Sequence, residues 1–102
     1  MERYKEALVR ELKPDRIILY GSFARGDVNE GSDVDLIVIT DWKEDPLERI
    51  GKLLELNKFN IPIEPLGYTE EEFERLIEER NPFILQVLDE GKVIYQAERR
   101  GR

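Results

Sequence analysis

The stretch Ile17–Leu36, IILYGSFARGDVNEGSDVDL, decides the fold of this chain. Its apolar run 17–20 stops at Gly21, as a buried strand would. Residues 21–26 are typical of a turn that opens a short helix, with Ser22 as its cap and Gly26 at its end. After a polar loop, residues 35–40 predict a second strand, apolar on both faces. Helices must therefore cover the sheet on at least one side.

Outward from this stretch, helical and strand patterns alternate. Apolar spacing predicts a first helix over residues 4–13, ending before Pro14. Pro46 suits the first position of another, which we expect to end near Lys58. We expect its apolar residues to share one side, and these are Leu47, Ile50, Leu53, Leu54 and Leu56.

The second half of the chain continues the alternation. Residues 60–67 predict a third strand whose two prolines indicate an edge or irregular hydrogen bonding. A capping box at residues 69–72 starts a helix that buries Phe73, Leu76 and Ile77. Another helix runs from Asn81 to about Gly91, before a last strand over 92–95. The order predicts a single α/β sandwich over residues 1–97, with a small mixed sheet of about four strands and a flexible tail at 98–102.

Composition restricts the chemistry. The 102 residues contain no Cys and no His, so carboxylates, hydroxyls, Lys, Arg and backbone groups must carry any reaction. That set favours a hard metal such as Mg²⁺. The net charge of −7 makes extended nucleic acid an unlikely main ligand. No apolar run is long enough to span a membrane, and no secretion signal is visible, so we expect a cytoplasmic protein.

Two features of the deciding stretch suggest a site, although each also has a plain structural interpretation. Gly21-Ser22 places backbone N–H groups and a hydroxyl at a helix N-terminus, where a phosphate is stabilised, but Ser22 alone is also an ordinary cap. Asp33 and Asp35 project from one face of a strand start, with Cα atoms about 6–7 Å apart. Such a pair binds metal or is merely solvated. If the two strands are neighbours, the Gly21-Ser22 turn and the two carboxylates lie side by side, which is the arrangement that a triphosphate bridged by metal requires.

The motif Gly21-Ser22-Phe23-Ala24-Arg25-Gly26, followed by Ser32-Asp33-Val34-Asp35-Leu36, resembles the signature of the polymerase-beta-like nucleotidyltransferase superfamily, in particular its minimal nucleotidyltransferase (MNT) branch. The resemblance implies the nucleotidyltransferase fold. It also implies that Gly21 and Ser22 contact the triphosphate, that Asp33 and Asp35 ligate two Mg²⁺ ions, and that a third carboxylate on a following strand completes the site.

Three further residues belong to the expected site. Glu64 is the only acidic residue of the third strand and matches the third carboxylate by order, as metal ligand or proton acceptor. The family more often has Asp there, and a Glu between two prolines could instead face solvent. Arg25 either clamps phosphate or forms an ion pair with Asp27 or Asp33. Ser32 either caps or orients the carboxylates beside the nucleotide.

The expected reaction is attack by an acceptor hydroxyl on the α-phosphorus of ATP, with transfer of AMP. The MNT resemblance further implies an antitoxin that pairs with a HEPN toxin, in some members by adenylylating a tyrosine. The alternative is a non-catalytic module that binds nucleotide or neutralises its partner by complex formation. Transfer to a small molecule and assembly with further copies of the chain stay open. The chain's own four tyrosines are expected to be packing groups, any exposed one being a potential acceptor.

Overall fold

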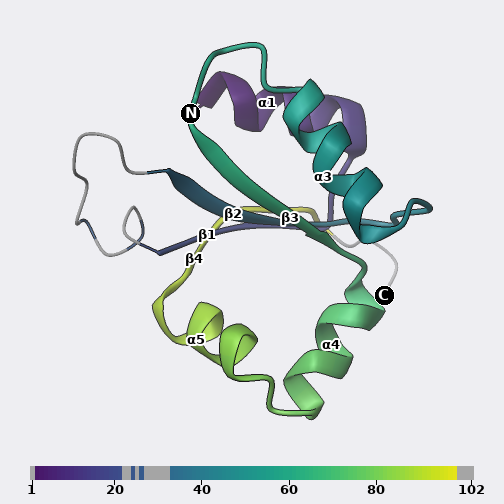
Figure 1. Cartoon of the computed structure of the whole chain (residues 1–102), viewed down its shortest axis with the longest axis vertical. Helices are drawn as coiled ribbons and strands as arrows, with labels where there is room; N and C mark the ends of the chain where they lie inside the picture. The colour runs from purple at the N-terminus through teal and green to yellow at the C-terminus, as the bar shows by residue number, and fades with distance from the viewer. Residues whose placement is uncertain (1, 22–23, 25, 27–32, 99–102) are drawn as a thin grey trace.

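Helices and strands alternate along the chain in its computed structural model, which describes residues 2–21, 24, 26 and 33–98. They are, in order, α1 (Glu2–Leu12), β1 (Arg16–Tyr20), β2 (Val34–Ile39), α3 (Pro46–Glu55), β3 (Ile63–Tyr68), α4 (Glu70–Glu78), α5 (Pro82–Glu90) and β4 (Lys92–Gln96). Figure 1 shows them around one sheet. The α/β sandwich predicted from the sequence is confirmed. Of the short helix expected over residues 21–26, only Gly21, Ala24 and Gly26 are among the described residues, and the tail from residue 99 on lies outside them.

The four strands form one mixed sheet in the order β3-β2-β1-β4. Strand β1 is antiparallel to both β2 and β4, and β2 is parallel to β3. This order places β3 at an edge of the sheet, as the prolines in its sequence predicted. Pro65 has no N–H to donate, and an edge strand tolerates this because one of its sides has no neighbouring strand. The parallel β2–β3 pair needs a crossover, and α3 provides it.

Helices cover both faces of the sheet, α1 and α3 on one and α4 and α5 on the other (Figure 1). The alternation of side chains along β2 explains this arrangement. Leu36 and Val38 join the core cluster of Tyr4, Leu8 and Leu53. Ile37 and Ile39 point to the opposite side and join the cluster of Phe73, Ile84 and Val87. In the described part of the chain, no helix is long and apolar enough to cross a bilayer.

The helix α3 departs from its predicted form in two ways. It begins as expected, with Pro46 in the first turn after a capping box made by Asp45 and Glu48, but it ends at Glu55 rather than near Lys58. The expectation that its leucines share a buried side is wrong for Leu47 and Leu54, which are 81% and 47% exposed. A helix on the edge strand buries only a narrow stripe, and here Leu53 occupies it. On α4, Phe73 is buried as predicted, whereas Leu76 and Ile77 are only partly buried.

The buried cation Arg49 of α3 connects the two helical layers around the β3 edge. Its guanidinium donates to the Glu44 carbonyl at 2.7 Å and to the Gly67 carbonyl at 3.1 Å. Two further bonds, of 2.7 and 3.1 Å, form a bidentate pair with the Glu72 carboxylate of α4. Because Arg presents a rigid planar fork, it can satisfy these acceptors at once.

Glu72 makes the stability of the domain sensitive to acid. The hydrogen bond from Arg49 lowers the pKa of Glu72, and bonds from the capping box add to the effect. A carboxyl whose pKa is depressed on folding stabilises the protein above its unfolded pKa of about 4.3, and that stability is lost as the pH falls through the folded pKa. We expect wild type to be more stable than Glu72→Gln at pH 7, with the difference shrinking below pH 4, as measured by urea unfolding. A difference independent of pH would contradict this ion pair.

Candidate active site

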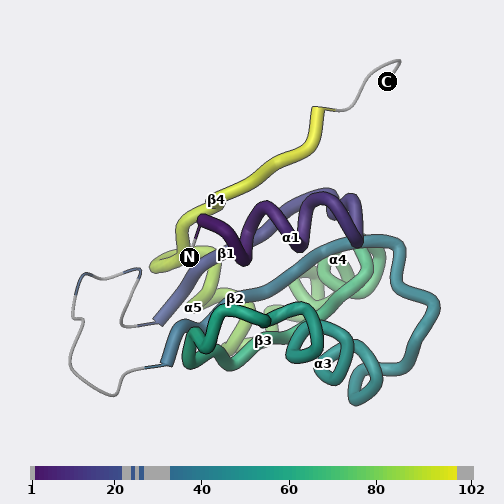
Figure 2. The backbone as a smooth tube through the Cα atoms, turned by 90° about the horizontal axis from the view of Figure 1, so that it is seen from above, coloured from purple at the N-terminus to yellow at the C-terminus, as the bar shows by residue number. Residues whose placement is uncertain are grey.

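The turn after β1 and the aspartate-bearing start of β2 lie side by side. The β1–β2 register pairs Tyr20 with Asp35, so Gly21 and Asp33 extend from the same end of two hydrogen-bonded strands. Figure 2 shows the two strand ends adjacent where the described chain stops and resumes. The neighbouring strands assumed from the sequence are thus confirmed, and they bring the Gly21 turn to the carboxylates.

The third candidate carboxylate comes from the other neighbour of β2. In the parallel β2–β3 pair, Asp35 is opposite Glu64. Asp35 alternates in phase with Ile37 and Ile39, and Glu64 with Leu66 and Tyr68, all of which pack toward α4 and α5. Asp35 and Glu64 therefore project from the same sheet face.

Gly21 is needed at its position for two reasons. Its φ of +74° lies in the left-handed region that side chains rarely adopt. A Cβ atom here would also clash with the Asp35 carboxylate, since the Asp35 Cγ would lie 3.2 Å away and an oxygen nearer still. The turn backbone and this carboxylate are therefore in direct contact, which only glycine permits.

The carboxylates that lie close together in the site raise the pKa values of neighbouring groups. Hydrogen bonding with Asp33 raises the pKa of Glu64, and the charge of Asp35 adds to the rise. Burial raises the pKa of the Tyr20 phenol, and the charges of Asp35 and Glu64 raise it further. Negative charges this close repel one another unless a cation or a proton intervenes.

This donor set fits Mg²⁺. The three carboxylates offer only hard oxygen ligands, the kind that Mg²⁺ prefers, and the raised pKa of Glu64 marks a position that a cation would stabilise. As they lie, the described side chains form no group of three with metal-binding spacing. Asp33 and Glu64 are exposed, so their side chains have room to turn toward an ion. Asp33, Asp35 and Glu64 are the residues that would hold the ion.

The structure places some predicted site residues and not others. Gly21, Asp33, Asp35 and Glu64 are brought together, and their roles stay predictions. Ser22, Arg25 and Ser32, expected at the nucleotide, lie outside the described residues, as does Asp27. Tyr20 was expected to be a packing group, with a role in the reaction only as a possible acceptor, and it borders the carboxylates. Its position directly before Gly21 was the available signal in the sequence.

Replacing Gly21 by alanine should damage the site more than the fold. Left-handed backbone costs a non-glycine residue about 1–2 kcal/mol, and the added methyl must displace the Asp35 carboxylate. We expect a modest loss of thermal stability and a loss of nucleotide affinity of at least tenfold by calorimetry. Gly51→Ala is the matched control, because a Cβ there meets open space on an exposed helix. Equal affinity in the two variants would contradict the role of the turn.

Comparisons with known proteins agree with this geometry. The family model described as "Nucleotidyltransferase domain" matches residues 1–94. Two curated relatives come from Methanocaldococcus jannaschii. "Putative protein adenylyltransferase MJ0604" is 38% identical over 81 residues, covering 78% of this chain and 77% of the relative. "Putative protein adenylyltransferase MJ0141" is 42% identical over 62 residues, covering 55% of this chain and 61% of the relative.

Solved structures share the fold at low sequence identity. One from Sulfolobus solfataricus, described as a putative nucleotidyltransferase, has a TM-score of 0.67 at 15% identity, covering 96% of this chain and 78% of the other. A second, described as a toxin-antitoxin with AMP-PNP, has a TM-score of 0.63 at 22% identity, covering 95% of this chain and 74% of the other. With the family model matching nearly its whole length, the chain belongs to the nucleotidyltransferase domain family of MNT-type proteins and is a nucleotidyltransferase.

Proposed function

We propose that this protein transfers AMP from ATP to a tyrosine hydroxyl of a HEPN-type toxin in a Mg²⁺-dependent reaction, and so acts as an antitoxin in the cytoplasm. One observation carries the proposal: the carboxylates of Asp35 and Glu64, from adjacent strands, face the same side as the Gly21 turn that contacts Asp35. A phosphate-binding turn beside oxygen ligands is the arrangement that nucleotidyl transfer requires.

The residues of the site have separable tasks in this reaction. The backbone at Gly21 and the Ser22 hydroxyl would hold the triphosphate, and Arg25 and Ser32 would assist in binding the nucleotide. Asp33 and Asp35 hold the metal ions, with Glu64 as third ligand or as acceptor of the tyrosine proton. Two bound Mg²⁺ ions would supply charge neutralisation for the attacking and leaving oxygens.

The reaction balances without a further reactant. The tyrosine oxygen forms a bond to the α-phosphorus, and the bond from that phosphorus to the bridging oxygen of the β-phosphate breaks. Pyrophosphate leaves with the bond's electron pair, and the tyrosine proton passes to a carboxylate or to water. With no His in the chain, a carboxylate is the available protein base.

The choice of acceptor is supported by what is known of similar proteins. Two relatives carry the name protein adenylyltransferase, and one structural neighbour is a toxin-antitoxin with AMP-PNP. Both point to a protein acceptor and an adenine nucleotide.

Mass spectrometry of a reconstituted reaction tests the proposal. The protein is incubated with ATP, MgCl₂ and a candidate HEPN toxin, and the intact mass of the toxin is followed. We expect the toxin to gain one or more AMP masses on tyrosine only when Mg²⁺ is present. A toxin that is inhibited in a stable complex but keeps its mass would instead establish the non-catalytic mode of neutralisation.

A further inference from the structure

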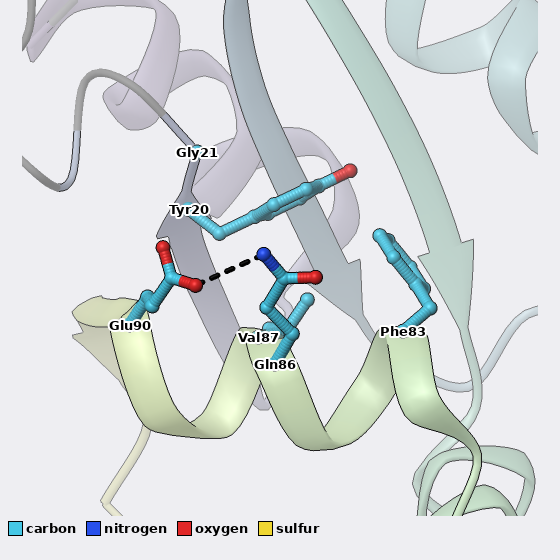
Figure 3. Close-up of a pocket in the computed structure, with 6 residues that line it drawn as sticks. All are labelled: Tyr20, Gly21, Phe83, Gln86, Val87 and Glu90. Carbon is cyan, nitrogen blue, oxygen red and sulfur yellow. Dashed lines mark hydrogen bonds between the residues drawn. The ribbon is translucent and has the colours of Figure 1, made fainter.

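A pocket between β1 and α5 adjoins the Gly21 turn. Its volume is about 160 Å³, and Figure 3 shows its lining residues, Tyr20, Gly21, Phe83, Gln86, Val87 and Glu90. This volume is well below that of pockets for drug-sized ligands, which start near 300 Å³. It suits one flat ring system rather than a whole nucleotide. Since Gly21 belongs to both the pocket and the turn, a nucleotide held at the turn can extend its base here.

Two aromatic side chains give the pocket a surface for a flat ring. Tyr20 and Phe83 meet edge to face, with centroids 5.5 Å apart and planes at 79°. Phe83 is 39% exposed, so part of its ring is accessible to a ligand. Any of the nucleobases can stack on such rings, because every base has a flat π-face. The aromatic pair therefore explains binding of a base but not the choice of base.

The polar part of the pocket is oriented by a neighbouring charge. The Gln86 side-chain amide donates from Nε2 to a Glu90 carboxylate oxygen at 2.9 Å. Because an ionised carboxylate only accepts, this bond fixes which end of the amide carries the nitrogen. Figure 3 shows the Gln86 Oε1 atom turned the other way, toward the side of Phe83. The Gln86 amide thus presents one acceptor, Oε1, and next to it the second hydrogen of Nε2.

This pair of groups distinguishes the two purines. Adenine offers an N6 amino donor beside the N7 acceptor, and a glutamine amide pairs with both. Guanine offers O6 and N7, which are both acceptors, so its O6 would face Gln86 Oε1 without a proton between them. A flip of the amide would relieve this contact, but it would turn Oε1 toward the Glu90 carboxylate.

We propose that this pocket binds the nucleobase of the substrate, and that Gln86, held in one orientation by Glu90, selects adenine over guanine. The inference rests on the proposed function, because it assumes that a nucleoside triphosphate binds at the Gly21 turn. Tyr20 and Phe83 contribute stacking, and Glu90 acts as a positioning residue through Gln86. The selection is moderate, since both Gln86 and Phe83 keep contact with solvent.

Calorimetry with Mg²⁺ and three probes tests this assignment: nonhydrolysable ATP and GTP analogues and inorganic tripolyphosphate. For wild type we expect the ATP analogue to bind about tenfold tighter than the GTP analogue. Gln86→Leu, which keeps helix propensity, and Glu90→Gln should each bring that ratio close to one. Phe83→Ala should weaken both analogues about equally. None of the three should change the affinity for tripolyphosphate, and Gln96→Leu, on the exposed part of β4, is the matched control.

The outcomes separate the two proposals. If both analogues and tripolyphosphate bind, but the ratio is near one in wild type or survives Gln86→Leu and Glu90→Gln, the base assignment is wrong while the nucleotide site stands. If no probe binds in the presence of Mg²⁺, the nucleotide site itself is wrong and the assignment fails with it. Circular dichroism of each variant confirms folding, and Glu90→Gln keeps the test valid should Gln86→Leu unfold.

Discussion

Exchanging Asp33 and Asp35 together for asparagine is expected to abolish AMP transfer, with a rate at least about 10³-fold below wild type. Asparagine keeps the size of each side chain but removes the charge that holds the metal ions. Metal ions stabilise such transition states by several kcal/mol, and every 1.4 kcal/mol corresponds to about tenfold in rate. The measurement is the initial rate of AMP incorporation into the partner.

The fold should survive this change, because Asp33 is exposed and Asp35 is only partly buried among repelling carboxylates. The control is Asp41→Asn with Asp89→Asn, two exposed positions that remove the same amount of charge. If the control loses as much activity as the site variant, net charge rather than metal binding is responsible. Unchanged activity in the site variant would contradict the assignment of these carboxylates.

Arg49→Leu should cause a large loss of stability, about 3 kcal/mol, the low end of the range for broken buried ion pairs. The Arg49 side chain is only 7% exposed, and its loss leaves the Gly67 and Glu44 carbonyls without their hydrogen-bond donor. The Glu72 side chain, at 38% exposure, can be hydrated in part by water instead. At roughly 4–8 °C per kcal/mol for a domain of this size, the melting temperature should fall by about 12–24 °C. Differential scanning calorimetry measures it.

Lys52→Leu on the same helix is the matched control. Its ammonium forms a 2.5 Å ion pair with Glu44, but the side chain is 51% exposed, and surface pairs contribute little. We expect only a small change of melting temperature. Equal losses in the two variants would contradict the view that Arg49 joins α3, β3 and α4 around the sheet edge.

Much of the fold was accessible from local patterns. The run Ile17–Tyr20, the apolar stretch that follows Asp35, the capping box at residues 69–72 and Pro46 each specify an element through nearby residues alone. Pro62 and Pro65 of the predicted strand correctly indicated an edge, because the missing N–H is a local property. These signals do not depend on which elements eventually pack together.

The rest depends on tertiary packing, which no local pattern encodes. Periodicity grouped Leu47 and Leu54 with Leu53, but how wide a stripe α3 buries is decided by its place on the edge strand. The burial of Arg49 likewise requires acceptors from three separate segments.

The candidate site also has one part that the sequence predicts and one part that only the tertiary structure brings together. Its motif residues were recognisable by order along the chain, whereas the pairing of Glu64 with Asp35 depends on strand register. The pocket of Tyr20, Phe83 and Gln86 forms only because α5 returns to the end of β1, more than 60 residues later in the chain. Sequence spacing gives no sign of it.

Titration of the protein with a nonhydrolysable ATP analogue, with and without Mg²⁺, measures the property on which the proposed reaction depends. Binding at micromolar affinity in MgCl₂, a loss of at least tenfold when EDTA replaces the metal, and the same loss in the Asp33→Asn, Asp35→Asn variant are the predicted results. An affinity that is the same in MgCl₂ and EDTA, and the same in wild type and the double variant, would show that the nucleotide is bound elsewhere or by other groups.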